Sequence, residues 1–208
     1  MLKEKLKGLN IILASGSPRR HTFFREMGIP FTVAVREVDE VCPDNLKAAG
    51  ITDHLAKLKA SAFTELAEND VVVTSDTIVW QPSKTAKNEG RALGKPKDRA
   101  TAHAMLRALS GQMHEVYTSV CFTGPHFQTV VNDRTRVWFK NLSDDEIYYY
   151  IETCKPYDKA GSYGIQDWLG HIATERLEGC FFNVMGLPTR LVYKTLVAIA
   201  ENRPAKQH

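Results

Sequence analysis

The chain has 208 residues, of which 43% are hydrophobic and 25% charged, and its net charge at pH 7 is +3. This is the balance of a soluble globular domain, and the charge is too small to indicate nucleic-acid binding by itself. There is no apolar run near the roughly 20 residues of a membrane helix, no signal-peptide pattern and no C-x-x-C pair, which together favour a cytoplasmic protein with reduced cysteines.

The first motif, Ser15–Arg20, lies between a predicted strand at Ile11–Ala14 and a predicted helix from Pro18 to Met27. Such a turn points free backbone N–H groups and the positive end of the helix dipole at one spot. Arg19 and Arg20 add two cations there, which oppose the dipole unless an anion lies among them. The motif predicts a phosphate site. A capped surface helix with two solvated arginines is the alternative.

An acid interrupts the strongest strand pattern of the chain. The run Val71–Trp80 is rich in β-branched residues, and Asp76 stands in its middle. A buried carboxylate is costly unless it binds a cation or is well hydrogen-bonded. Upstream, Glu40 ends an acidic turn, and Lys59 falls on a helix predicted to be capped at Thr52 and Asp53 and to run to Ala67. Taken singly, Glu40 is also compatible with a solvated turn, Lys59 with an exposed helical lysine, and Asp76 with a structural role.

The remaining pattern alternates strands and helices, with two consecutive strands in its second half. The expected elements are a strand at 31–35, a loop or hairpin tip at 81–90, a helix at 98–110, strands at 114–123 and 127–140, a helix opened by a capping box at 143–146, a glycine-rich loop at 158–166 and a helix at 188–201. The alternation predicts an α/β fold, and the consecutive strands predict a mixed sheet with antiparallel pairs.

These separated segments supply two carboxylates and several cations, with Lys95 in the stretch Gly94–Asp98 as a further one. That composition is typical of a site for a polyphosphate and a hard divalent metal, because Mg²⁺ takes one or two carboxylates plus phosphate oxygens. Cations then neutralise charge on the transferring phosphoryl group.

The sequence resembles the Maf family of nucleoside triphosphate pyrophosphatases. Short blocks carry the resemblance, and they follow the family's order over nearly the whole chain: Ser15–Arg20, Asp39–Glu40, Lys59, Ser75–Val79, Gly94–Pro96, Leu109–Gly111, His114, Val116, Thr118, Lys155–Gln166 and Gly186–Pro188. Three residues depart from the family's pattern. Ser75 replaces an alanine, Lys155 replaces an acid, and Asp167 replaces a glycine beside Gln166.

The resemblance implies one domain over residues 1–208, with an elongated, mixed, partly antiparallel sheet flanked by helices, and two lobes around a central cleft. This architecture is similar to that of inosine-triphosphate pyrophosphatases. It also implies a cytoplasmic enzyme that cleaves a nucleoside triphosphate to the monophosphate and pyrophosphate with Mg²⁺ or Mn²⁺. The combination of Thr77 with Gln166, and the Ser-Pro-Arg-Arg form of the first motif, resemble the subgroup acting on dTTP and UTP.

The same resemblance assigns roles to individual residues. Asp76 is expected to accept the proton of the attacking water or to hold the metal, and Glu40 to help hold the metal. The expected substrate-binding residues are Ser15, Arg19, Arg20, Lys59, Thr77, Lys95 and Gln166, with Thr77 and Gln166 facing the base. The expected partner is a small nucleotide, with no membrane, and a homodimer is one possible assembly. A nucleotide- or nucleic-acid-binding regulator of cell division is the alternative, although the cations form no basic stripe with interleaved aromatic residues.

Overall fold

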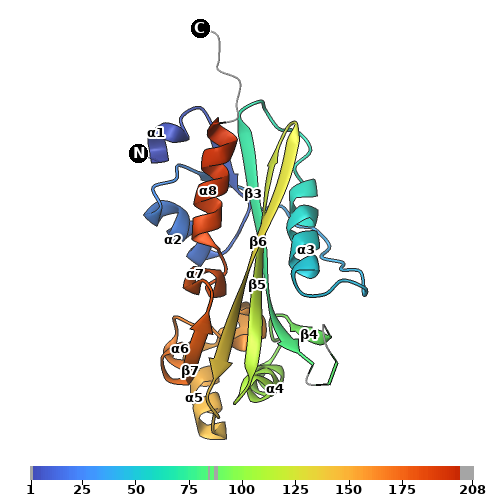
Figure 1. The fold of residues 1–208 in the computed structure, drawn as a ribbon, viewed down its shortest axis with the longest axis vertical. Helices are drawn as coiled ribbons and strands as arrows, with labels where there is room; N and C mark the ends of the chain where they lie inside the picture. Colours follow the sequence, from blue (N-terminus) through green and yellow to red (C-terminus); the bar gives the residue numbers. More distant parts are fainter. Residues whose placement is uncertain (1, 84, 87–88, 202–208) are drawn as a thin grey trace.

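The computed structural model describes residues 2–83, 85–86 and 89–201. Seven strands in these residues form one long sheet that runs through the molecule from end to end (Figure 1). The strands are β1 (Asn10–Leu13), β2 (Thr32–Val33), β3 (Asp70–Pro82), β4 (Gly90–Leu93), β5 (Met113–Gly124), β6 (Phe127–Phe139) and β7 (Thr174–Glu178). Their order is β2-β1-β3-β5-β6-β7, and β4 pairs with the far end of β3.

The sheet is mixed, as predicted. β1 is parallel to both β2 and β3, whereas β3, β5, β6 and β7 pair antiparallel in succession. β3 is almost wholly buried along its length, which explains its near-continuous run of Val, Ile and Thr. Asp76 lies opposite Ser119 of β5, in the middle of the pairing between β3 and β5.

Helices cover both faces of the sheet, and Figure 1 shows them at different heights along it. Helices α1 (Leu2–Lys5), α2 (Pro18–Glu26) and α8 (Thr189–Glu201) lie near one end, and α4 (Arg99–Leu109), α5 (Asp144–Cys154) and α6 (Trp168–Ala173) lie near the other. On the opposite face from α8, α3 (Ala49–Ser61) packs on β3 and β5. The four-residue α7 (Phe181–Val184) lies between the two ends. No helix in the described part of the chain is long and apolar enough to cross a membrane.

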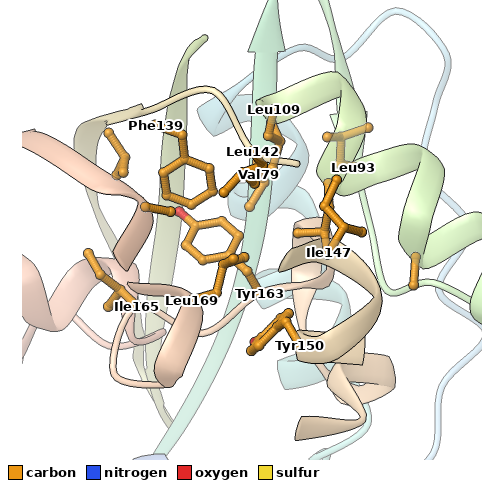
Figure 2. Packing of buried hydrophobic residues seen from close by; sticks show 14 of the residues in the cluster. Val79, Leu93, Leu109, Phe139, Leu142, Ile147, Tyr150, Tyr163, Ile165 and Leu169 are labelled. Carbon is orange, nitrogen blue, oxygen red and sulfur yellow. The ribbon is translucent and has the colours of Figure 1, made fainter. Parts of the chain in front are cut away.

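Two separate hydrophobic cores correspond to the two ends of the sheet. The first core joins α2 and α8 to β1, β3 and β5 through residues such as Phe24, Leu13 and Leu196. The second core joins α4, α5 and α6 to the other end of the same strands, with Tyr150, Phe139 and Tyr163 at its centre (Figure 2). The division into two lobes on one sheet follows from these two cores.

The helix predicted to begin at Thr52–Asp53 begins at Ala49 instead and ends at Ser61. The hydroxyl of Thr52 hydrogen-bonds to Ala49 O and Ser119 Oγ, so it does not cap the helix. Asp53 likewise accepts from Ser119 and Asn132 of the sheet. The two residues that looked like a helix start therefore attach the helix to the sheet.

Burial of His114 makes the second core sensitive to acid. The ring is fully buried between Phe139 and Tyr163, and its Nε2 lies 2.7 Å from Tyr163 Oη. Burial lowers the pKa of His114 to about 3. In the unfolded chain this histidine has an ordinary pKa of about 6.5.

We expect stability to be lost as the pH falls from about 6.5 towards 3, because the unfolded state takes up the His114 proton first. The loss from this residue is about 2 kcal/mol by pH 5. Urea unfolding at pH 7 and pH 5 measures this change in the free energy of unfolding, and the change should be smaller in His114→Gln. His126→Gln, which removes an exposed histidine, should show the same change as the parent. Equal slopes in the parent and His114→Gln would contradict the prediction.

Candidate functional site

A cavity of about 660 Å³ lies where the two cores meet, beside the middle of β3. Each site residue predicted from the sequence lines it, although these residues come from six separate segments of the chain. They are Ser15, Arg19, Arg20, Glu40, Lys59, Asp76, Thr77, Lys95 and Gln166.

The turn between β1 and α2 forms one wall of the cavity. Ser17 occupies the N-cap position with extended backbone, and Pro18 is the first helical residue, as predicted. The Ser17 side chain makes no capping hydrogen bond; instead, Ser15 Oγ accepts from the Ser17 N–H at 3.3 Å. The first-turn N–H groups of α2 are therefore left without a side-chain cap, which suits binding of an anion there.

The two arginines of this turn have different surroundings. Arg20 donates to Gly186 O at 2.9 Å, Ser75 O at 2.8 Å, Thr77 Oγ1 at 3.2 Å and Ser15 Oγ at 3.4 Å. Burial lowers the pKa of Arg20 to about 10, which leaves it charged at neutral pH. Most of its donors are thus committed to the protein, and it joins three distant segments.

Arg19, by contrast, makes one ion pair, from Nη1 to Asp158 Oδ2 at 3.1 Å. Its side chain is about one-third exposed, and its remaining donors face no partner in the described residues. Arg19 is the cation of this turn that is free to take a phosphate oxygen.

Thr77 has its hydroxyl proton committed to a chain of hydrogen bonds. Thr118 Oγ1 donates to Asn183 O at 3.0 Å, and Thr77 Oγ1 lies 3.0 Å from Thr118 Oγ1. Because a hydroxyl has one proton, Thr77 must donate to Thr118. Thr77 also accepts from Arg20, so it offers the cavity only acceptor capacity.

Asp76 and Glu40 share one counter-ion. Lys59 Nζ lies 2.6 Å from Asp76 Oδ1 and 3.2 Å from Glu40 Oε1. The Asp76 side chain is mostly buried, whereas that of Glu40 is half exposed. This contact satisfies the requirement for a cation beside the buried carboxylate of β3.

The donor set fits a hard divalent metal that also binds substrate. Asp76 Oδ2 has no hydrogen-bond partner in the described chain, and Glu40 contacts the same Lys59 ammonium as Asp76 Oδ1. The described residues contain no cluster of three or more metal-ligating side chains. Two carboxylates without a full protein cage are the arrangement in which Mg²⁺ takes its other ligands from phosphate and water.

Lys95 also lines the cavity, and the glycine-rich loop holds its segment in place. Its side chain is exposed and makes no ion pair in the described residues. The Gly161 N–H donates to Gly94 O at 3.0 Å. Gly161 has a φ of +65°, and a Cβ there would lie 2.7 Å from Val79 Cγ2, so both backbone and space require glycine.

Gln166 ends this loop with one half of its amide unpaired. Nε2 donates to Asp167 Oδ1 at 3.1 Å, whereas Oε1 is buried and has no hydrogen-bond partner. An unpaired buried carbonyl oxygen is costly, and a ligand N–H at this position would remove that cost.

Two further cations, Lys159 and Arg36, line the cavity, and the sequence analysis did not assign them to the site. Lys159 pairs with Asp158 at 2.8 Å and lies 3.6 Å from Asp167. Arg36 lies over the Phe63 ring at 4.5 Å. Lys159 lies in the glycine-rich block Lys155–Gln166, so the family resemblance could have indicated it. Arg36 belongs to none of the blocks that carry the resemblance, so no sequence signal indicated it.

Fold and cavity together define an α/β protein with a cavity lined by two carboxylates and several cations. The Maf-like protein family matches residues 10–199, and the chain belongs to this family.

Curated relatives extend over almost the full length of the chain. A dTTP/UTP pyrophosphatase of Flavobacterium johnsoniae is 52% identical over 200 residues, which is 96% of this chain and 100% of the relative. The protein of the same name from Christiangramia forsetii is 53% identical over 94% of this chain and 97% of its own length. One from Parabacteroides distasonis is 41% identical over 93% and 97%. Among solved structures, the Ham1 protein of Staphylococcus aureus gives a TM-score of 0.41 at 15% identity, covering 62% of this chain and 71% of that one.

Arg20→Ala should destabilise the protein by about 1–3 kcal/mol, because carbonyl oxygens of Ser75 and Gly186 lose their donor. Arg20→Lys should not restore stability, since an ammonium cannot reproduce the planar fork of donors. Arg19→Ala, which removes a single partly exposed ion pair, should cost less than about 1 kcal/mol. Urea unfolding of the three variants tests this; equal losses for Arg19→Ala and Arg20→Ala would exclude the structural role of Arg20.

Proposed function

We propose that this protein hydrolyses dTTP and UTP to the nucleoside monophosphate and pyrophosphate, with a divalent cation. The observation that carries the proposal is the convergence of two carboxylates and several cations on one cavity of nucleotide size. The names of the curated relatives, dTTP/UTP pyrophosphatases at 41–53% identity, support the same substrates.

In this proposal the cations hold the triphosphate. The N–H groups at the start of α2 and the guanidinium of Arg19 take phosphate oxygens, and Lys95 takes others. Arg20 contributes by holding the turn against β3. Fixing the three phosphates from both segments brings the bond between the α- and β-phosphates to one position beside β3.

Asp76 provides the chemistry at that position. Its free oxygen, Oδ2, would accept the proton of the attacking water or hold the cation, and Lys59 contacts the other oxygen until a cation binds. A bound Mg²⁺ or Mn²⁺, held by Asp76 and Glu40, would neutralise phosphate charge and lower the pKa of a bound water. Lys59 is then free to shift its contact from the carboxylates to phosphate.

Gln166 is proposed to bind the base. Uracil and thymine present a ring N3–H between two carbonyl groups, and Gln166 Oε1 is an acceptor without a donor. One Nε2 hydrogen goes to Asp167, and the second remains for a base carbonyl.

Pyrophosphate release in Mg²⁺ or Mn²⁺ from a panel of dTTP, UTP, CTP, dCTP, GTP and 7-methyl-GTP tests the function. We expect the highest kcat/KM for dTTP and UTP, because uracil and thymine present a ring N–H flanked by two carbonyl groups to the Gln166 amide, whereas cytosine lacks this N–H and guanine has a carbonyl on one side of it only. Binding without turnover would instead favour a nucleotide-binding regulator. A preference for CTP or methylated GTP would overturn the substrate and leave the reaction class intact.

Asp76→Asn should lower kcat by about a hundredfold or more, since it removes the base or metal ligand without changing shape. We expect it to fold, because Lys59 keeps Glu40 as a partner. Ser75→Ala, next along the same strand, removes a buried hydroxyl that has no hydrogen bond, and its rate should stay near the parent's. Near-normal turnover by a folded Asp76→Asn protein would contradict the role of Asp76 as proton acceptor or metal ligand.

A further inference from the structure

Asp167 occupies the N-cap position of α6, yet its side chain makes no capping hydrogen bond. Oδ1 accepts from Gln166 Nε2 at 3.1 Å, and Oδ2 accepts from the Tyr150 hydroxyl at 2.9 Å. The Lys159 ammonium lies 3.6 Å from Oδ2. The carboxylate is therefore directed at Gln166 and its neighbours rather than at the N–H groups of the helix.

The partner that anchors Asp167 belongs to the rigid second core. Tyr150 is fully buried there, in the same cluster as Tyr163 and Ile147 (Figure 2). The Gly164 N–H donates to Tyr150 Oη at 3.0 Å, so the hydroxyl proton goes to Asp167. Burial raises the pKa of Tyr150 above its ordinary value, which keeps that proton in place.

Gly164 leaves the space in which Asp167 and Gln166 meet. A Cβ at Gly164 would lie 2.6 Å from both Asp167 Oδ2 and Gln166 Nε2. The absence of a side chain at this position is thus a requirement for the contact between the carboxylate and the amide.

The contact fixes which end of the Gln166 amide is free. A carboxylate oxygen only accepts hydrogen bonds, so the NH₂ end must face Asp167 and the carbonyl oxygen must point to the other side. That oxygen, Oε1, is buried and unpaired in a residue that lines the cavity. Reversing the amide would set its oxygen against the carboxylate.

We propose that Asp167 is a specificity-positioning residue, which locks the Gln166 amide with its oxygen free and so selects bases with a ring N–H over cytosine. The proposal rests on the nucleotide substrate proposed above. Uracil and thymine donate N3–H to the free oxygen, whereas the N3 of cytosine carries a lone pair and would face a second acceptor. Cytosine would require the reversed amide, which Asp167 excludes.

The test compares kcat/KM for UTP and CTP in the parent and in Asp167→Asn. Asparagine is nearly isosteric, and its oxygen can accept the Tyr150 hydroxyl proton. Its NH₂ group then faces Gln166, which favours the reversed Gln166 amide. We expect the UTP-to-CTP ratio to fall about tenfold or more. Tyr150→Phe keeps the carboxylate but removes its anchor, and should lower the ratio as well, so the proposal stays testable if Asp167→Asn does not fold.

Two controls separate positioning from a general loss of structure. Asp158→Asn removes another carboxylate that pairs with Lys159 and lines the cavity without contacting Gln166, and it should leave the ratio unchanged. In a Gln166→Leu background, Asp167→Asn should change the ratio no further, because its effect passes through the amide.

An unchanged ratio in folded Asp167→Asn overturns the proposal, and so does an equally large change in the Gln166→Leu background. Failure of the parent to release pyrophosphate from UTP or dTTP would count against the proposed function alone. In that case, the affinities of UMP and CMP, measured by calorimetry in the same variants, decide the role of Asp167.

Discussion

The Arg20 guanidinium holds together the place where the two lobes meet. Its donors reach Ser15 in the first turn, Ser75 and Thr77 on β3, and Gly186 in the segment before α8. These acceptors come from parts of the chain that the sheet alone does not connect. A planar group with five fixed donors suits such a junction, because each acceptor is held in a defined direction. The cavity walls depend on this junction for their spacing.

β3 links the junction to the carboxylate of Asp76. Successive side chains of a strand point to opposite faces, so Asp76 faces Lys59 on α3 while Thr77 faces Arg20 and Thr118. A single buried strand thereby supplies a charged group to one side and a hydrogen-bonded hydroxyl to the other. The antiparallel pairing with β5 over the whole region keeps both in register.

The sequence analysis predicted which residues line the cavity, but it did not predict which hydrogen bonds and ion pairs they make. The strand pattern around Asp76 and the turn at Ser15–Arg20 were strong local signals, and the structure brings both to one cavity. From the sequence, Arg19 and Arg20 were predicted to have the same role. Local patterns carry no information about distant hydrogen-bond acceptors, and Arg20 donates to two of these, Ser75 O and Gly186 O. The short elements α6, β7 and α7 also escaped prediction, since segments of four to six residues are too short to show a period.

The two lobes contribute different kinds of recognition to the cavity. In the proposed function, the first lobe supplies the helix start and Arg19, which would bind phosphate and depend little on the identity of the base. The second lobe supplies the segment 158–167, whose amide and carboxylate are anchored by Tyr150 of its core. Hydrogen-bond polarity discriminates between bases only when the protein group cannot rotate to suit either one. Anchoring the segment 158–167 in a packed core, and not on the surface, provides that rigidity. Under the proposed function, the separation of the two cores along one sheet would let phosphate binding and base selection be set by different parts of the same chain.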